Sequence, residues 1–219
     1  AATVVPRLVA GGWRVAATAR PGHEAKVEAR YAELGDAVHV IGVDLASPEG
    51  TAGAVARLGG ALGSPAALVH LAGLFEPGPA AGAGSAAAAE ALERALSGNL
   101  RSAVNAAAAV LPALLAAGSG AIVGVGAAAV RSPSPGAVAY AAAKAALAAY
   151  FRSLAAQVAK RGVNVSLVMP AGSFDTPGNR ESMPNADKSV WISPEAFAEA
   201  VEFLLGRPAR GLVHELPLS

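Results

Sequence analysis

Short apolar runs alternate with longer helical stretches along this chain. The apolar runs are rich in Val, Ile and Leu and show little polar alternation, which is typical of strands covered by helices on both faces. The runs predicted as strands are Trp13–Thr18, Val38–Val43, Ala66–Leu71, Ala121–Val125, Val163–Met169 and Leu212–His214. Helices are predicted between them, near residues 23–34, 48–60, 86–117, 137–161 and 194–205. This alternation predicts a parallel sheet in an α/β layer fold.

Two of the predicted helices have clear start signals. Pro48 and Pro194 each follow a serine, which is a common arrangement of N-cap and first helical residue. The chain shows no internal repeat and no linker of distinct composition. We therefore expect residues 1–219 to form a single domain, which is long enough to bury a substantial core.

Residues 102–130 carry no charged side chain and are long enough to resemble a membrane span. Asn105, Pro112 and the segment Gly118-Ser119-Gly120 interrupt this run, and its apolar character comes mostly from alanine, which is only mildly apolar. The run is therefore predicted to be a buried helix, a turn and a buried strand. No membrane partner is expected.

Composition narrows the class further. Hydrophobic residues make up 53% of the chain and charged residues 15%, which argues against disorder. The formal net charge of +1 argues against a nucleic-acid partner, and the absence of cysteine excludes disulfides and thiolate metal sites. His23, His39 and His214 lack metal-ligand spacing, so no metal is expected. A cysteine-free chain is compatible with the cytoplasm, where we expect the protein.

The clearest chemical pattern is Tyr140-Ala141-Ala142-Ala143-Lys144. Residues four apart share one face of a helix, so the phenol and the ammonium group are expected side by side. A nearby cation favours the phenolate and is expected to lower the pKa of Tyr140 toward working pH, where it could transfer a proton. By itself the pair is short enough to arise by chance.

Other segments strengthen the pattern, and with them the sequence resembles the short-chain dehydrogenase/reductase family over nearly its whole length. The resemblance implies a Rossmann-type, doubly wound parallel sheet in three α/β/α layers. It also implies a catalytic set of Asn99, Tyr140 and Lys144. The segments that carry the resemblance are VIGVDL with Asp44, His70-Leu71-Ala72-Gly73, GNLRSAVNAAAAVLPAL with Asn99, GAIVGVGAAA, and the Tyr140–Lys144 pair.

The family binds a nicotinamide cofactor. The positions that the resemblance assigns to cofactor binding are Arg20, Asp44, Leu45, Ala72, Gly73, Tyr140, Lys144, Pro170 and Thr176. Where an acidic residue would end the second family strand and favour NAD, this chain has Ala19 followed by Arg20, which suits the 2′-phosphate of NADP. NADPH is therefore expected, with NADH as the alternative.

Two departures from the family pattern stand out. The family serine that precedes the tyrosine by thirteen residues is replaced by Ala127, which has no donor; Ser132 and Ser134 are interpreted as loop serines. The family also opens with a strand and a Thr-Gly-x-x-x-Gly-x-Gly loop that holds the cofactor pyrophosphate. This chain opens with AATVVPRLVAGGWRVAATAR, which resembles the helix after that loop. We favour loss of the first strand from this sequence over a degenerate member of the family.

The stretch DTPGNRESMPNADKSVW, residues 175–191, is unusually varied for this chain. Together with Ala127 and the Pro-Gly before Tyr140, it resembles the quinonoid dihydropteridine reductase branch of the family. On this resemblance, residues 170–191 are expected to form a lid, and the substrate would contact Phe75, Ala127, Asn179, Arg180 and Trp191. The alternative is a surface loop or a dimer contact.

These features predict an NAD(P)H-dependent reductase that transfers a hydride to a quinonoid dihydropterin-like small molecule, with Tyr140 as proton donor. One alternative is a reductase of another carbonyl or quinone-like compound. Another is a catalytically silent partner subunit that lacks the nucleotide loop. A homodimer or homotetramer is expected to form through the helices at 99–117 and 137–161, as the family resemblance implies.

Overall fold

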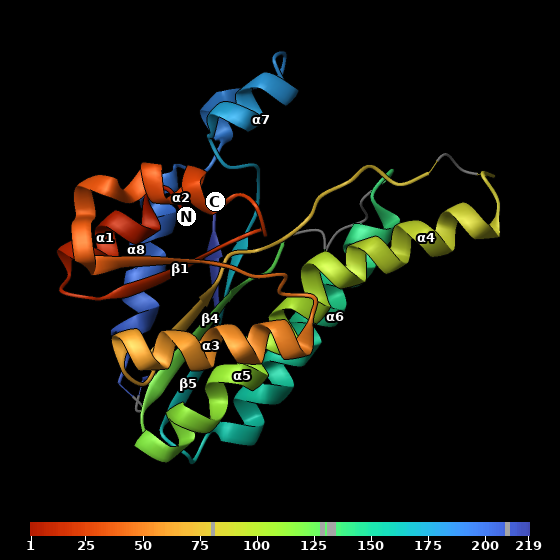
Figure 1. Ribbon diagram of the computed structural model, residues 1–219. Coiled ribbons are helices and arrows are strands. Elements are labelled where there is room, and N and C mark those ends of the chain that lie inside the picture. The colour runs from red at the N-terminus through yellow and green to blue at the C-terminus, as the bar shows by residue number, and fades with distance from the viewer. Residues whose placement is uncertain (80–81, 128–129, 131–134, 209–210) are drawn as a thin grey trace.

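The structure is a computed structural model that describes residues 1–79, 82–127, 130, 135–208 and 211–219 (Figure 1). The strands are β1 (Val15–Ala19), β2 (Val38–Gly42), β3 (Ala67–His70), β4 (Gly120–Val125), β5 (Val163–Pro170) and β6 (Glu215–Leu218). The α-helices are α1 (Val4–Ala10), α2 (Glu24–Tyr31), α3 (Pro48–Leu62), α4 (Ser85–Leu96), α5 (Ser102–Ala117), α6 (Val138–Val158), α7 (Pro177–Ser182) and α8 (Pro194–Leu205). Two 3₁₀ turns, η1 (Ala32–Ala37) and η4 (Lys188–Val190), and a π-helical segment, η2 (Ser97–Arg101), complete the described elements.

Strand pairing is parallel throughout the described residues. β1 pairs with β2, and a separate four-stranded sheet has the order β3-β4-β5-β6. The register between the two central strands aligns Ile122 with Val165. Every residue of β5 is buried, as expected for a strand covered on both faces. The predicted α/β fold is confirmed.

Two apolar clusters cover the two faces of the larger sheet. On one face α5 and α6 pack against β4 and β5, with Leu114, Leu147 and Phe151 almost fully buried. On the other face α1 and α8 pack on the same strands through residues such as Val4 and Val201. Figure 1 shows α3, α5 and α6 on one side of the strands and α1 and α8 on the other. The three-layer arrangement therefore follows from strands that are apolar on both faces.

The helix starts predicted from serine and proline are confirmed. Ser47 and Ser193 each accept a hydrogen bond at the helix start, from the backbone N–H groups of Gly50 and Ala196 respectively. Each satisfies a backbone donor that the helix cannot. Observed α8 spans the predicted interval, residues 194–205.

The last strand is a correction. It was predicted at Leu212–His214, but β6 begins only at Glu215. The carbonyl oxygens of Val213 and His214 accept hydrogen bonds from the Ser166 hydroxyl and the Leu167 N–H, at 2.6 and 2.8 Å. The ladder with β5 then runs from Leu167–Glu215 to Pro170–Leu218. Its sequence contains a proline, which an edge strand tolerates because one row of its N–H groups is not needed for pairing.

The uncharged run 102–130 folds largely as predicted. It contains α5, a turn in which Gly118 has a left-handed φ of 64°, and strand β4; residues 128–129 lie outside the described residues. The helical stretch from Ser85 to Ala117 is long and apolar enough to cross a membrane, judged by length and composition alone. A core helix passes the same test, and α5 buries Ala103, Ala107 and Leu114 against the sheet.

Within the described ranges, β1 and β3 are each paired on one side only, so the molecule contains two sheets rather than one. The order β2-β1 followed by β3-β4-β5-β6 leaves both unpaired edges on the same cavity, because residues of β1 and β3 line it together.

Candidate active site

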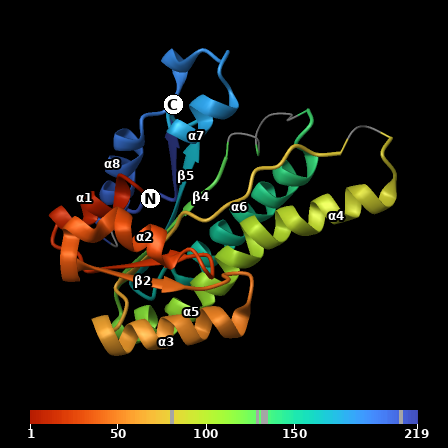
Figure 2. The same ribbon diagram turned by 45° about the horizontal axis from the view of Figure 1, so that its top comes forward.

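The site lies at the edge of the sheets where the parallel strands end. Arg20 follows β1, Asp44 follows β2 and Leu71 follows β3, while Gly126 and Ala171 follow β4 and β5. In open α/β sheets ligands bind at the carboxyl ends of the strands. Figure 2 shows helix α7 at this end of the molecule, beyond the end of β5.

Lys144 lies on the inner face of α6, with a relative exposure of only 5%. Its ammonium group donates a hydrogen bond of 2.9 Å to the carbonyl oxygen of Val125, at the end of β4. Burial lowers the pKa of Lys144 to about 8, because the charged form loses its hydration. The amine therefore titrates close to physiological pH.

Tyr140 lies one helical turn before Lys144 and is half-buried. The Lys144 ammonium nitrogen is 5.9 Å from the centroid of the Tyr140 ring. The expectation that the lysine would lower the pKa of Tyr140 is wrong for this structure: burial raises the pKa of the phenol. The physical reason is that desolvation of the phenolate dominates, while the ammonium group is directed at the Val125 carbonyl.

Asn99 is completely buried and lies in the π-helical segment η2, between α4 and α5. Its side-chain amide donates to the carbonyl oxygens of Leu74 and Ala95, at 2.8 and 3.0 Å. Its Oδ1 accepts a hydrogen bond from the Leu74 N–H at 3.2 Å. One side chain thereby fixes the loop after β3 to the α4–α5 helix pair. Single π turns inside helices occur frequently at functional sites.

Gly73 lies where Asn99 and Lys144 come closest to the loop after β3. A Cβ atom placed on Gly73 would lie 3.1 Å from Asn99 Oδ1 and 3.6 Å from Lys144 Nζ. Gly98, in η2, similarly allows close approach, since a Cβ atom there would lie 2.9 Å from the Cβ of Leu74. These two glycines let the loop and the helix pair approach without displacement. The structure thus brings together Asn99, Lys144 and the loop that the sequence assigned to the same site.

A buried histidine near Lys144 was not identified from the sequence as a functional group. His70 ends β3, and its Nε2 lies 3.3 Å from the hydroxyl oxygen of Ser102. Burial, with a smaller contribution from the positive charge of Lys144, lowers the pKa of His70 to about 4. The imidazole is therefore neutral at physiological pH. The sequence offers one signal for this contact: Ser102 is a polar residue at the start of the mostly apolar run 102–130.

Phe75 contacts Tyr140 directly. The two rings meet edge to face, with centroids 5.0 Å apart and planes at 80°. The Phe75 side chain is 64% exposed, so most of its ring surface remains available to a ligand. A hollow of about 10 Å³ beside Tyr140, bordered by Leu74 and Ala139, holds no more than one water molecule. Within the pair, Phe75 is therefore exposed to solvent, whereas Tyr140 is half-buried.

The residues assigned to the adenosine end of a cofactor follow β1 and β2. Arg20 is exposed, and no carboxylate among the described residues pairs with its guanidinium group. Asp44 accepts a hydrogen bond of 2.9 Å from the N–H of Ala46. The carbonyl oxygen of Leu45 accepts 2.9 Å from the amide of Asn105, a positioning contact that sequence reasoning missed. Like Ser102, Asn105 is a polar residue near the start of α5.

The remaining predicted contacts lie at the ends of β4 and β5. Ala127 is buried after β4 and carries no donor, as the sequence already implied. Pro170 is the buried last residue of β5. Ser132 and Ser134, interpreted as loop serines, lie outside the described residues. Ala72, which precedes Gly73, is exposed.

The segment after β5 leaves the sheet and returns across a narrow base. Phe174 and Ile192 form a parallel bridge, closed by hydrogen bonds of 2.9 Å from Ile192 N to the Ser173 carbonyl and from Asp175 N to the Ile192 carbonyl. The ring of Phe174 packs edge to face on Phe197 of α8, at 5.0 Å between centroids. The excursion 175–191 is therefore anchored at its base and projects beyond the sheet.

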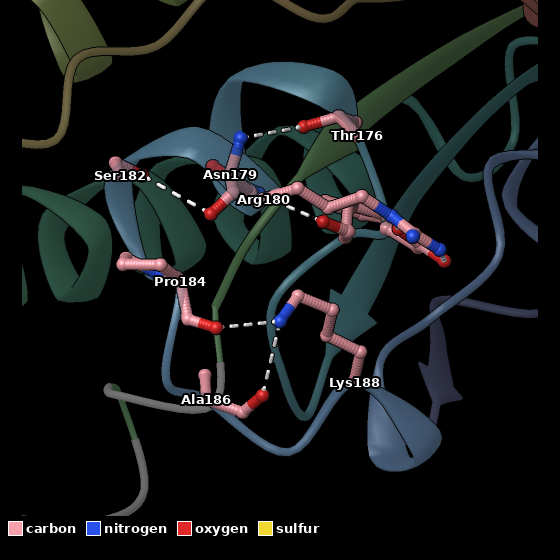
Figure 3. A network of polar contacts seen from close by, with 9 residues as sticks. Thr176, Asn179, Arg180, Ser182, Pro184, Ala186 and Lys188 are labelled. Carbon is pink, nitrogen blue, oxygen red and sulfur yellow. Dashed lines mark hydrogen bonds and ion pairs between the residues drawn. The ribbon is translucent and has the colours of Figure 1, made fainter.

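Within this excursion the polar side chains satisfy one another (Figure 3). Arg180 forms a bidentate ion pair with Asp175, at 2.5 and 2.6 Å. Thr176 accepts a hydrogen bond from the Asn179 N–H at 3.2 Å, and the Asn179 amide donates to the Phe174 carbonyl at 2.9 Å. The structure therefore gives the Arg180 side chain a partner within the excursion and the Asn179 side chain a partner at its base.

The far side of the excursion is ordered by Lys188. Its ammonium group donates to the Pro184 carbonyl at 2.8 Å (Figure 3). The same nitrogen lies 5.8 Å from the centroid of the Trp191 ring. A cation over an indole face is attracted by the ring quadrupole. Trp191 is half-buried and follows η4 directly.

Comparison with known proteins identifies sequences and structures that are similar to this chain. Residues 1–187 match the sequence model of the family described as short chain dehydrogenase. A protein of Xanthobacter autotrophicus named inactive 2-(S)-hydroxypropyl-CoM dehydrogenase 2 is 32% identical over 216 residues, which covers 92% of this chain and 90% of that protein. An uncharacterized oxidoreductase of Staphylococcus haemolyticus is 32% identical over 108 residues, covering 49% of this chain and 46% of that protein.

Solved structures share the fold at lower sequence identity. A serine dehydrogenase in complex with NADP⁺ superposes with a TM-score of 0.85 at 23% identity, covering 99% of this chain and 88% of that one. An actinorhodin polyketide ketoreductase with NADPH gives a TM-score of 0.85 at 22% identity, covering 99% and 90%. At these identities the likeness concerns the fold.

Proposed function

This chain belongs to the short-chain dehydrogenase family, and we propose that it is an NADPH-dependent reductase that uses Tyr140 as its proton donor. The observation that carries this proposal is that Asn99 and Lys144 both lie against Gly73, and that Lys144 is one helical turn from Tyr140. The two hydrogen bonds between the Asn99 side chain and the Leu74 backbone support a role for Asn99 in positioning the loop after β3.

The protonation states suit a reductase. Burial raises the pKa of Tyr140, so the phenol carries its proton at neutral pH and can donate it. Lys144, with a pKa of about 8, holds a proton that it can exchange near working pH. General acid catalysis is most effective when the pKa lies near the operating pH, and of these two groups Lys144 has the pKa nearer to it. In this scheme Tyr140 delivers the proton and Lys144 helps to restore it.

The residues present fit a nicotinamide cofactor at two places. Arg20, free of a carboxylate partner in the described chain, suits a 2′-phosphate, and Asp44 with Leu45 borders the adenosine end. At the other end Ala72 and Gly73 are exposed, and Gly73 adjoins Lys144. Pro170 and Thr176 border the site after β5. The bound cofactor would supply a hydride.

The proposed substrate is a flat, conjugated ring, and the specific candidate is a quinonoid dihydropterin. Ala127 provides no hydroxyl for a developing oxyanion, a contact whose loss typically costs about 2.7–4 kcal/mol in the barrier. A conjugated ring spreads the charge that hydride addition creates, so it depends less on such a donor. The exposed ring of Phe75, beside Tyr140, offers a surface on which a heterocycle can stack.

We propose the excursion 175–191 as the lid over this substrate. Its base is fixed by the Phe174–Ile192 bridge, whereas its tip is held together by contacts of its own residues. A rigid tip on a narrow base is a structure that can swing as a unit and exclude water. In this proposal the closed lid brings Arg180, Asn179 and Trp191 into contact with the substrate.

Turnover tests the proposal directly. Oxidation of NADPH and of NADH is followed with a quinonoid dihydropterin and, separately, with a simple ketone. Tyr140→Phe is compared with Tyr150→Phe, a control on the same helix whose phenol is also partly buried. We expect Tyr140→Phe to lower turnover about 10²- to 10⁴-fold and Tyr150→Phe to leave it unchanged. Equal activity of the two variants would refute Tyr140 as proton donor.

A second candidate is a catalytically silent subunit. The observation in its favour is the word inactive in the name of the 32%-identical relative. The two candidates differ in nucleotide binding as well as in turnover. A silent subunit would show neither NADPH binding by calorimetry nor oxidation with either substrate, and its unfolding temperature would not respond to the cofactor.

We further propose a homodimer formed through α5 and α6. Both helices are rich in alanine, which allows close helix packing, and Val138, at the start of α6, is 75% exposed. Sedimentation velocity measures the oligomeric state. Loss of dimer in a variant with Val138→Glu would support this surface, and an unchanged dimer would place the interface elsewhere.

A further inference from the structure

The π-helical segment that carries Asn99 depends on one serine. In η2 the backbone N–H of Ser102 bonds to the carbonyl oxygen of Ser97, five residues earlier. An α-helix would instead direct this N–H to Gly98, four residues earlier. The Ser102 hydroxyl replaces that bond and donates to the Gly98 carbonyl at 2.9 Å. One side chain thus satisfies the carbonyl group that the π turn leaves without its α-helical donor.

His70 holds this serine from the neighbouring strand β3. Its Nε2 lies 3.3 Å from the Ser102 hydroxyl oxygen, and both side chains are buried. A hydroxyl has a single proton, which Ser102 gives to the Gly98 carbonyl over the shorter distance. The imidazole is neutral, because burial lowers the pKa of His70 to about 4, so it has one N–H. These partners place that hydrogen on Nε2, with the imidazole as donor and the serine oxygen as acceptor.

The same segment also holds the loop that follows His70. Asn99 lies directly after Gly98, and its side chain bonds to both backbone groups of Leu74. Its amide also donates to the Ala95 carbonyl at 3.0 Å. The end of β3 and the loop after it are therefore fixed to one π turn at two points. These two contacts bracket the loop residues that are proposed to border the cofactor.

We infer that His70 and Ser102 form a positioning pair that keeps η2 in its π register and thereby directs Asn99 at the loop after β3. An α-helix advances by about 100° per residue, so relaxation of the π turn to the α-helical pattern would rotate α4 and α5 relative to each other by about that angle. Asn99 would then lose Leu74. The effect of the pair on turnover rests on the proposed function, whereas its effect on the Leu74 amide does not.

Two amide substitutions of His70 separate the hydrogen bond from packing. In His70→Gln the amide nitrogen lies as far along the side chain as Nε2 does in histidine, whereas in His70→Asn it lies only as far as Nδ1. Only the glutamine therefore reaches the Ser102 oxygen. Ser102→Ala removes the hydroxyl itself with little change in volume. Asn105→Ala, three residues further along the helix, removes a bond to Leu45 and is the control.

Hydrogen exchange of the Leu74 amide, followed by NMR, reports whether Asn99 holds the loop, because this N–H bonds to Asn99 Oδ1. We expect exchange to become about tenfold faster in His70→Asn and Ser102→Ala, and to stay unchanged in His70→Gln and Asn105→Ala. The amides of the fully buried strand β5 report global opening. Equal acceleration of the Leu74 and β5 amides would mean that the pair only stabilises the fold, and would overturn the inference.

A double variant tests whether the two residues act through one contact. His70→Asn combined with Ser102→Ala should exchange the Leu74 amide no faster than Ser102→Ala alone, because the second change finds no bond left to break. Multiplied effects of the two changes would overturn the pairing. Ser102→Ala keeps the test decisive if His70→Asn does not fold.

Steady-state kinetics with NADPH and a quinonoid dihydropterin give the catalytic consequence. His70→Asn should lower kcat about tenfold and leave the KM for NADPH within about twofold, and His70→Gln should restore kcat. If the unmodified chain shows no turnover, the proposed function fails, and the Leu74 exchange still decides on the pair. If Tyr140→Phe abolishes turnover but Leu74 exchange is the same in His70→Asn and His70→Gln, the reductase stands and this inference is overturned.

Discussion

The side chain of Asn99 holds the backbone of Leu74 at two points: its amide donates to the Leu74 carbonyl and its Oδ1 accepts from the Leu74 N–H. The two residues are 25 positions apart, and the contact joins the loop after β3 to the π-helical segment between α4 and α5. Gly73, directly before Leu74, adjoins Lys144. The loop next to the proposed proton donor is therefore held by a single buried amide.

Replacing Asn99 by Ala should destabilise the fold and lower turnover together. The change leaves the N–H and C=O of Leu74 without these partners, and an unsatisfied buried polar group costs about 1–3 kcal/mol. Urea unfolding and NADPH oxidation measure the two effects. Asn105→Ala, which removes a hydrogen bond to Leu45 instead, is the matched control and should spare the loop after β3. Full activity of Asn99→Ala would contradict the positioning role.

Replacing Arg20 by Gln should weaken NADPH selectively. A hydrogen bond to a charged group contributes about 1.5–3 kcal/mol, so the KM for NADPH should rise about tenfold or more while that for NADH stays unchanged. Arg57→Gln removes a charge from the exposed side of α3 and serves as the control. If Arg20→Gln altered both cofactors equally, a role in recognising the 2′-phosphate would be excluded.

His70 should make the fold sensitive to moderate acid. Its pKa is lowered from 6.5 to about 4 in the folded state, so the unfolded chain takes up a proton first as the pH falls. The stabilisation is present above pH 6.5 and is lost between pH 6.5 and 4, and over that whole interval it amounts to about 3 kcal/mol.

The measurement is urea unfolding between pH 7 and pH 4.5. The lower limit keeps small the contribution of Asp175 and Asp187, whose pKa values are lowered by hydrogen bonds. His70→Asn should lose less stability over this interval than the unmodified chain, and the exposed His23→Asn should behave like the unmodified chain. Identical pH profiles for all three would show that the burial of His70 has no such consequence.

Ala127→Ser should broaden the substrate range. The new hydroxyl would restore a donor at the end of β4, and a donor to a developing oxyanion is worth about 10²- to 10³-fold in kcat. Turnover of a simple ketone should rise toward that factor, while turnover of a conjugated substrate should change little. Ala142→Ser, at an exposed position of α6, is the control. Comparable gains for both substrates would argue against the proposed conjugated ring.

The lid proposal predicts effects on substrate affinity with little effect on folding. Arg180→Gln breaks the bidentate pair with Asp175, and Trp191→Leu removes the ring beside Lys188. Each should raise the KM for substrate several-fold, because the tip of the lid loses its fixed shape. Glu181→Gln alters the next position of α7 without touching the pair. Unchanged KM values in both lid variants would make the excursion a surface feature.

The sequence by itself determined the layers of this protein. Strands without polar alternation, separated by helices, require coverage on both faces, and the four-residue spacing of Tyr140 and Lys144 places both on one helix whatever surrounds it. Serine–proline helix starts act through local hydrogen bonds, and for that reason they were predictable.

Only the tertiary structure decided the remaining features, because they depend on groups far apart in the chain. The π-helical segment, within a stretch predicted as one helix, places Asn99 against Leu74. The position of β6 depends on its contacts with β5: the Val213 carbonyl accepts a hydrogen bond from the Ser166 hydroxyl, and the strand pairing begins only at Glu215. The direction of the Tyr140 pKa shift could not be predicted from the sequence, because the spacing identifies Lys144 as a neighbour but does not show how deeply the phenol is buried. In the structure, desolvation of the phenolate outweighs the effect of Lys144.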